Sequence, residues 1–119
     1  YLTNAHIPLY KHAATIKNQD IIPLELEHMS LVSNFSMPVV FKTKELFNSY
    51  RAKFEKNDVE IRPIIAGDMT QQPFFRKYVS EYDPCPNARF VHENGFYFGN
   101  SPDMTEEEVE KLCALASKL

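Results

Sequence analysis

Apolar residues recur at helical spacing in the middle of the chain, directly after a residue suited to begin a helix. The apolar stripe consists of Leu46, Phe47, Tyr50 and Phe54, which share one face of an α-helix. Thr43 precedes the stripe, and its hydroxyl can accept hydrogen bonds from the first free amides. We expect the helix to end near residues 57–58. Its charged residues are expected to face solvent: Lys44, Glu45, Arg51, Lys53 and Lys56.

A second helical pattern occupies the C-terminal end of the chain. Thr105 and Glu108 have the spacing of a capping box, and the acidic residues that follow Thr105 suit the positive end of a helix. Cys113 falls on the apolar side, which predicts a packed structural thiol. The predicted buried face consists of Val109, Leu112, Cys113, Ala116 and Leu119.

Three stretches have the composition of β-strands. Residues 31–41 are rich in β-branched and aromatic residues, residues 59–65 carry three isoleucines, and residues 96–98 are all aromatic. Pro38 and Pro63 interrupt the first two stretches, and proline cannot donate to a strand ladder. These strands are therefore expected to be short, broken, or on a sheet edge.

The segment between the second and third predicted strands is polar and rich in turn residues. Gly67 permits a positive φ, and Asp68 or Thr70 can cap the segment that follows. We expect a short helix over residues 72–81 and another helix that begins at Pro86 and ends at residues 94–95 with a left-handed cap. A further helix is expected over residues 9–18.

Length and composition narrow the class of protein. The chain has 119 residues, a net charge of −3, 44% apolar and 13% aromatic residues. This composition can form a core, which argues against a disordered chain. No apolar run is long enough to span a bilayer, and no basic stripe indicates a nucleic-acid binder. The order of the elements predicts a single α+β domain, residues 1–119, with three or four short strands and helices on one side.

Cysteine usage and the first residue bear on the setting of the chain. Cys85 and Cys113 cannot form a disulfide framework, so a reduced, cytoplasmic setting is expected. Tyr1 stands at the start in place of Met, which suggests a fragment or a processed chain. Within the domain, residues 1–20 are interpreted as a connecting region.

Residue types that carry chemistry form few clusters. The four histidines lack metal-ligand spacing, and three glycines do not form a phosphate-binding loop. Two polar segments stand out. Arg62 lies in an apolar strand ahead of the polar residues 68–72, and His92 begins a polar run before the aromatic strand. Taken alone, these segments are more typical of turns than of a binding site.

The same two segments resemble motifs of the DegT/StrS family of sugar-nucleotide enzymes. Residues 60–73, EIRPIIAGDMTQQP, resemble the family stretch "IETRPI-AGN-TRQP", and residues 86–100, PNARFVHENGFYFGN, resemble "PNAD-I-H-NGF-IGN". Residues 101–108 resemble its closing "P-LTEEE" helix start, and residues 34–38 resemble its "SWFGFPI" strand more loosely. The resemblance runs from about residue 20 to the end and keeps the family's order and spacing.

The resemblance implies that this chain is a C-terminal small domain. Family members are fold type I enzymes that use pyridoxal phosphate (PLP) or pyridoxamine phosphate (PMP), usually as homodimers, with the active site between a large and a small domain. The small domain has a short, mostly antiparallel sheet with helices on one face. The substrates are nucleotide-linked 4-keto-6-deoxysugars used for lipopolysaccharide, capsule or antibiotic sugars. The "RPI-AGN-TRQP" form most resembles the 3-dehydratase branch, which uses PMP.

Roles follow for the residues that match the family's motifs. Arg62 can pair with a substrate phosphate or hydroxyl. The resemblance implies no catalytic residue here, because the cofactor Lys, or the His that replaces it, lies in the large domain. The chain alone is therefore expected to be inactive and to bind no cofactor. The candidate substrate-binding residues are Arg62, Asp68, Thr70, Gln72, His92 and Asn94.

Some positions depart from the family's motifs. Asp68 stands where the motif has Asn, Gln71 where it has Arg or Lys, and Arg89 where it has Asp, which points to a different substrate. Two further interpretations remain open: an aminotransferase domain that works with PLP, and a stand-alone binding or interaction domain without catalysis. A large exposed apolar patch is expected where the small domain would meet the large one.

Overall fold

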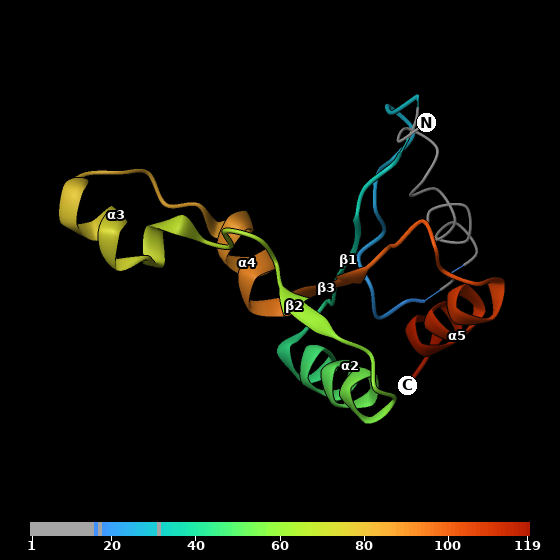
Figure 1. Cartoon of the computed structure of the whole chain (residues 1–119). Coiled ribbons are helices and arrows are strands. Elements are labelled where there is room, and N and C mark those ends of the chain that lie inside the picture. The colour runs from blue at the N-terminus through green and yellow to red at the C-terminus, as the bar shows by residue number, and fades with distance from the viewer. Residues whose placement is uncertain (1–15, 17, 31) are drawn as a thin grey trace.

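The computed structural model describes residue 16, residues 18–30 and residues 32–119, and shows a small antiparallel sheet with helices packed on one side (Figure 1). The elements in chain order are β1 (Ser36–Val40), α2 (Lys44–Lys56), β2 (Ile61–Pro63), the 3-10 helix η2 (Met69–Gln71), α3 (Pro73–Tyr78), α4 (Pro86–Asn94), β3 (Gly95–Gly99) and α5 (Glu106–Ser117). The predicted α+β class, the antiparallel sheet and the helices on one face are confirmed.

The sheet has the order β1-β3-β2, with β3 antiparallel to both neighbours. Met37 and Ile61 both pair with Phe98, and Val39 pairs with Phe96. Since alternate residues of a strand point to opposite faces, these side chains line one face of the sheet. Pro38 and Pro63 lie in the outer strands β1 and β2. The edge interpretation of the two prolines is therefore confirmed, and each strand is short.

The helices α2 and α5 cover the apolar face of the sheet and enclose an aromatic core. Tyr50 and Phe54 of α2 are fully buried. The ring of Phe54 lies 5.3 Å from both Phe96 and Phe98, and Phe41 stacks on Tyr50 at 4.6 Å. Helix α5 closes the core with Val109, Leu112, Leu115 and Ala116. The apolar stripe predicted over residues 46–54 thus packs where the sequence places it.

Capping residues set the ends of both core helices. The Thr43 hydroxyl accepts a hydrogen bond from the Leu46 amide, and α2 ends before Asp58, which has a φ of 58°. At the start of α5 the Thr105 side chain accepts from the Glu108 amide while the Glu108 carboxylate accepts from the Thr105 amide. The predicted capping box is therefore present.

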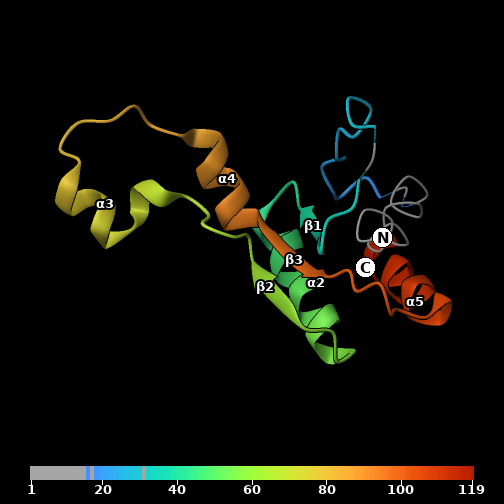
Figure 2. The same ribbon diagram turned by 45° about the horizontal axis from the view of Figure 1, so that its top comes forward.

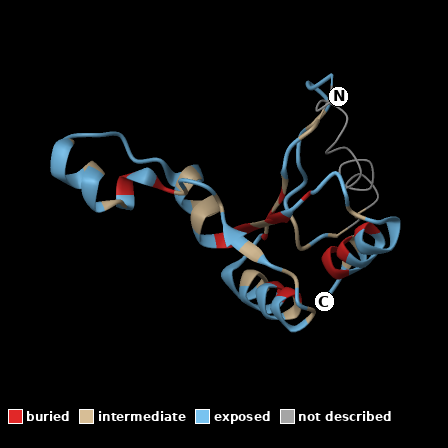
Figure 3. Cartoon of the chain, in the orientation of Figure 1, coloured by how far each residue is buried: buried red, intermediate tan, exposed pale blue. Residues whose placement is uncertain are grey.

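Residues 64–93, here called the arm, extend away from the sheet and the two core helices, here called the body (Figures 1 and 2). The arm contains η2, α3 and α4, and the molecule measures 49 × 35 × 25 Å. Most residues of the arm are exposed, as the pale blue colour in Figure 3 shows, and they include large apolar ones: Tyr78 is 76% exposed and Phe74 52%. The buried residues within the arm are Asp68 and Thr70, and both are polar.

Five details of the predicted elements differ from the structure. The first strand covers Ser36–Val40 rather than residues 31–41. The second strand covers Ile61–Pro63 rather than residues 59–65, and α3 covers Pro73–Tyr78 rather than residues 72–81. Leu119 is 56% exposed, because α5 ends at Ser117 and Lys118 is extended, so Leu115 takes the buried position. Lys53 is half-buried rather than solvent-facing, since its amine donates to the carbonyls of Leu115 and Lys118.

Two further expectations concern the helix ends. The left-handed cap predicted at residues 94–95 is wrong: Gly95 has extended dihedrals, because α4 passes directly into β3. The glycine is used instead for close approach, since a Cβ there would lie 2.8 Å from the Val91 carbonyl oxygen. Of the helix expected over residues 9–18, the structure describes residues 16 and 18, neither of which is helical. The other residues of that helix lie outside the described part.

Candidate functional site

The two polar segments singled out in the sequence meet where the arm joins the body. Ala66 and Gly67 are both left-handed, with φ values of 62° and 53°. This turn brings Gly67 against the last turn of α4, where a Cβ on Gly67 would lie 2.0 Å from Nδ1 of His92. The imidazole therefore occupies the space that any other side chain at position 67 would need. The sequence alone did not indicate this contact, because the two residues lie far apart along the chain.

Asp68 and Thr70 form a compact hydrogen-bonded cap at the start of η2. One carboxylate oxygen of Asp68 accepts from the Thr70 amide at 3.0 Å and from the Thr70 hydroxyl at 2.6 Å. The hydroxyl bond is the main cause that lowers the pKa of Asp68, and it outweighs the opposing effect of burial. Asp68 is 2% exposed. Its carboxylate is thus directed into the turn in this structure.

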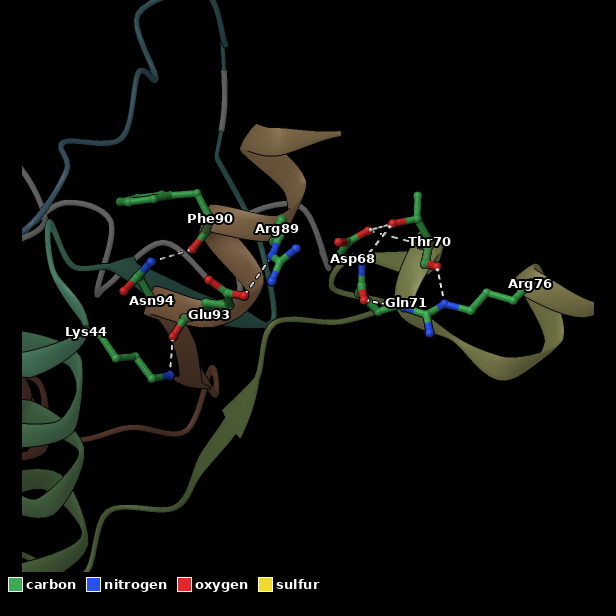
Figure 4. A network of polar contacts seen from close by, with 9 residues as sticks. All are labelled: Lys44, Asp68, Thr70, Gln71, Arg76, Arg89, Phe90, Glu93 and Asn94. Carbon is green, nitrogen blue, oxygen red and sulfur yellow. Dashed lines mark hydrogen bonds and ion pairs between the residues drawn. The ribbon is translucent and has the colours of Figure 1, made fainter. Parts of the chain in front are cut away.

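The side chain of Arg76 ties α3 to the same turn, as Figure 4 shows. Its guanidinium donates to the side-chain oxygen of Gln71 at 2.6 Å and to the Thr70 carbonyl at 3.3 Å. Gln72 sits between η2 and α3 as a backbone junction, and its side chain makes no capping bond to α3. The polar contacts of this turn are therefore local, within residues 68–76.

Arg89 on α4 faces the Asp68 turn across the arm (Figure 4). Its guanidinium donates to Glu93 at 2.9 Å, and its positive charge also contributes to lowering the pKa of Asp68. Asp68 and Arg89 are two of the positions that depart from the family motif. In this chain they carry opposite charges on facing segments, so the two departures offset each other electrostatically.

Asn94 is placed inside the fold, at the junction of α4 and β3. It is 6% exposed, and its side-chain amide donates to the Phe90 carbonyl at 3.0 Å. The backbone carbonyl of Asn94 accepts a hydrogen bond from the Phe41 amide at 2.9 Å. This bond joins α4 to the end of β1. In this structure Asn94 positions the helix that carries His92.

Arg62 and His92 share a groove of about 310 Å³ between α2 and β2. Arg62 lies on the edge strand, and its Nε donates to Glu60 at 2.8 Å while the side chain stays 64% exposed. His92 also lines the groove, and its ring lies against the Gly67 turn. Among the six candidate residues, Arg62 and His92 line the groove, whereas Asp68, Thr70, Gln72 and Asn94 do not.

Two further cationic residues line this groove. From the sequence, both were expected only to face solvent. Lys44 and Arg51 lie on α2, seven positions apart, and both contribute to the groove wall together with Phe47. The Lys44 amine donates to the Glu93 carbonyl at 2.5 Å (Figure 4). A signal was present in the sequence: residues 44, 47, 51 and 55 follow helical spacing beside the apolar stripe.

No described lysine is placed to bond an aldehyde cofactor. Every described lysine is exposed except Lys53, whose amine is taken up by two backbone carbonyls. An amine that bonds an aldehyde cofactor is usually desolvated and free. Within the described part of the chain, there is also no cluster of three or more metal-ligating side chains, and no helix suited to span a membrane.

Comparison with known proteins gives one structural match. No protein-family profile and no curated protein matches the sequence. The structure matches the C-terminal part of an E. coli GDP-4-keto-6-deoxy-D-mannose-3-dehydratase, a DegT-family enzyme solved with bound hydrated PLP, with a TM-score of 0.74 and 16% identity. The match covers 97% of this chain and 30% of that enzyme. The chain therefore has the fold of the C-terminal part of a PLP-dependent sugar dehydratase, as the sequence motifs predicted.

Proposed function

We propose that this chain is the C-terminal small domain of a vitamin B6-dependent enzyme that removes the 3-hydroxyl of a nucleotide-linked 4-keto-6-deoxysugar, in the synthesis of lipopolysaccharide or another surface polysaccharide. The observation that carries the proposal is the fold match over 97% of the chain to a dehydratase of this chemistry. The two sequence segments that resemble the family's motifs lie together at the Gly67–His92 contact, which supports the same assignment.

In this proposal the chain binds and orients, and the reactive groups belong to the rest of a longer protein. Bound to the large domain, PMP would supply the two electrons needed to replace the 3-hydroxyl with hydrogen, whereas PLP is the cofactor of the alternative aminotransferase reaction. Arg62 presents a planar guanidinium suited to a phosphate or to sugar hydroxyls. Its ion pair with Glu60 is exposed and therefore weak, so a substrate group can replace Glu60 as the partner of Arg62. The large domain and a second copy in a homodimer are the proposed protein partners.

The proposal is tested with the full-length gene product. The purified protein is expected to show a B6 cofactor absorbance band. Supplied with PMP as the two-electron reductant, it is expected to convert a nucleotide-linked 4-keto-6-deoxyhexose into its 3-deoxy derivative, seen by mass spectrometry as the loss of one oxygen atom. Replacement of the ketone oxygen by an amine would instead assign the aminotransferase reaction. A protein that binds no B6 cofactor and turns over no such sugar would contradict both reactions and favour a non-catalytic binding domain.

Substitution of Arg62 tests the contribution of this domain. Arg62→Ala is expected to raise KM or lower kcat about tenfold or more, because a charged hydrogen bond to the substrate is lost. Arg62→Lys, which keeps the charge but loses the planar fork, should recover part of the loss. Unchanged kinetics in Arg62→Ala would remove Arg62 from the site and leave the reaction assignment intact.

A further inference from the structure

The groove between α2 and β2 gathers positive charge in a chain whose net charge is negative. Lys44 and Arg51 line it from the helix, Arg62 lines it from the strand, and Glu55 is the acidic residue of its wall. The whole chain carries a net charge of −3. A concave site lined by like charges concentrates the electrostatic potential, so this groove attracts anions despite the overall charge.

Another hollow of the molecule has the opposite character. It lies beside Asp58, Glu60 and Glu108, with Lys111 as its basic residue. This second hollow abuts the same strand region, since Glu60 directly precedes β2. The two hollows beside β2 therefore carry opposite charge. The groove that includes His92 of α4 is mainly basic, and the hollow that includes Glu108 of α5 is mainly acidic.

The cations of the groove are held in place yet remain able to exchange partners. Arg51 pairs with Glu55 at 2.9 Å, and both side chains are more than half exposed. Arg62 pairs with the exposed Glu60. Such exposed pairs are weak, so a ligand with two or more negative charges can replace them. The Lys44 amine lies 4.0 Å above the Phe47 ring and bonds the Glu93 carbonyl, which fixes its position at the groove wall.

His92 is a further polar residue of the groove wall. Its Nδ1 is buried against the Gly67 turn and has no hydrogen-bond partner. A buried N–H without an acceptor is more costly than a buried lone pair, so the neutral ring is expected to carry its proton on Nε2. His92 lines the groove together with the three cations, and in this tautomer its ring carries one N–H donor.

We propose that the groove between α2 and β2 is a binding site for a phosphoryl anion, with Lys44, Arg51 and Arg62 as its cationic ligands and His92 as a neutral donor. A volume of about 310 Å³ is at the lower end of the range for small-molecule sites, which suits a diphosphate. The assignment of the anion to the diphosphate of a nucleotide-linked sugar rests on the proposed function, whereas the anion site rests on the groove alone.

The test is calorimetric titration of the full-length protein with inorganic pyrophosphate, at low and at physiological salt. Saturable binding is expected, and salt should weaken it because the contacts are between exposed charges. Arg51→Gln and Lys44→Gln should each weaken binding about tenfold, as expected for loss of one charged hydrogen bond. Lys56→Gln is the matched control: it removes the same charge from the same helix outside the groove, and should change binding less than twofold.

Two results would overturn the anion site: absence of saturable pyrophosphate binding, or an equal loss in Lys56→Gln, which would show attraction by charge alone. A nucleoside diphosphate is expected to displace pyrophosphate, and failure to compete would overturn the nucleotide assignment. Sugar turnover without pyrophosphate binding would reject the groove and keep the proposed function. Pyrophosphate binding without sugar turnover would keep the anion site and reject the proposed function.

Discussion

The body and the arm of this chain are stabilised by different forces. The body buries a continuous aromatic and aliphatic core in which Tyr50, Phe54 and Phe96 are almost fully excluded from solvent. The arm buries only Asp68 and Thr70, and its structure depends on hydrogen bonds between neighbouring residues. Burial of apolar surface is the main favourable contribution to folding. We therefore expect the body to unfold cooperatively and the arm to open locally at a lower free energy.

The two regions also differ in the apolar surface that they expose. Aromatic side chains of the arm such as Phe74 and Tyr78 remain exposed, although large exposed apolar groups commonly mark interaction surfaces. The sequence predicts an exposed apolar patch where a small domain would meet a large one, and the exposed rings of the arm are compatible with it. That contact stays a prediction.

The largest expected effect is a truncation in the core of the body. Phe54→Ala removes a fully buried ring that contacts both Phe96 and Phe98, and it should lower the free energy of unfolding by about 3–5 kcal/mol. Chemical denaturation followed by circular dichroism measures the loss. Phe74→Ala, at a ring that is 52% exposed on the arm, is the control and should change stability by less than about 0.5 kcal/mol. Similar losses in both variants would show that the arm has a core of its own.

The next effect lies at the junction between the two regions. Gly67→Ala places a methyl group against the His92 ring in a left-handed backbone, and the backbone alone costs about 1–2 kcal/mol. Hydrogen exchange should accelerate in residues 66–72 and in the last turn of α4, while the β3 amides stay protected. His92→Ala in the same chain should recover the steric part of the loss but not the backbone part. A loss that His92→Ala leaves unchanged would mean that the ring does not occupy that space.

A smaller effect is expected at the capping box of α5. Thr105→Ala removes the acceptor for the Glu108 amide and should destabilise the body by about 1 kcal/mol. Thr105→Ser keeps the hydroxyl and should restore most of the stability. Denaturation midpoints of the two variants check this, and equal midpoints would show that the cap is not formed in solution.

The sequence predicted local features better than contacts between distant residues, for a physical reason. The cap at Thr43, the buried stripe that includes Tyr50 and Phe54, and the Thr105 capping box follow from contacts within a few residues. The prolines of the edge strands also follow from a local property, the missing N–H. Such features can be identified from spacing alone.

The features that were missed depend on contacts between distant parts of the chain. The role of Gly95 was misassigned because its reason is the approach of the Val91 and Val39 carbonyls. Lys44, Arg51 and Arg62 line the same groove because α2 packs beside β2. This packing is a contact between distant parts of the chain. The motif resemblance located Arg62 and His92, but only the structure places the two residues in that groove.

The smallest expected effect concerns pH and separates the arm from the body. The hydrogen bond from the Thr70 hydroxyl holds the pKa of Asp68 below its ordinary value. A carboxyl group whose pKa is lowered by folding stabilises the folded state above its unfolded pKa and loses this contribution as the pH falls through the folded value. The arm should therefore loosen below about pH 4, before acid affects the apolar core directly. In NMR titrations, the Thr70 amide should move with a midpoint below that of an ordinary aspartate, and Asp68→Asn should abolish this transition while leaving the β3 amides unchanged. A Thr70 midpoint at the ordinary aspartate value would show that the cap does not bind the charged carboxylate, and the arm would then lack the polar contact that defines its difference from the body.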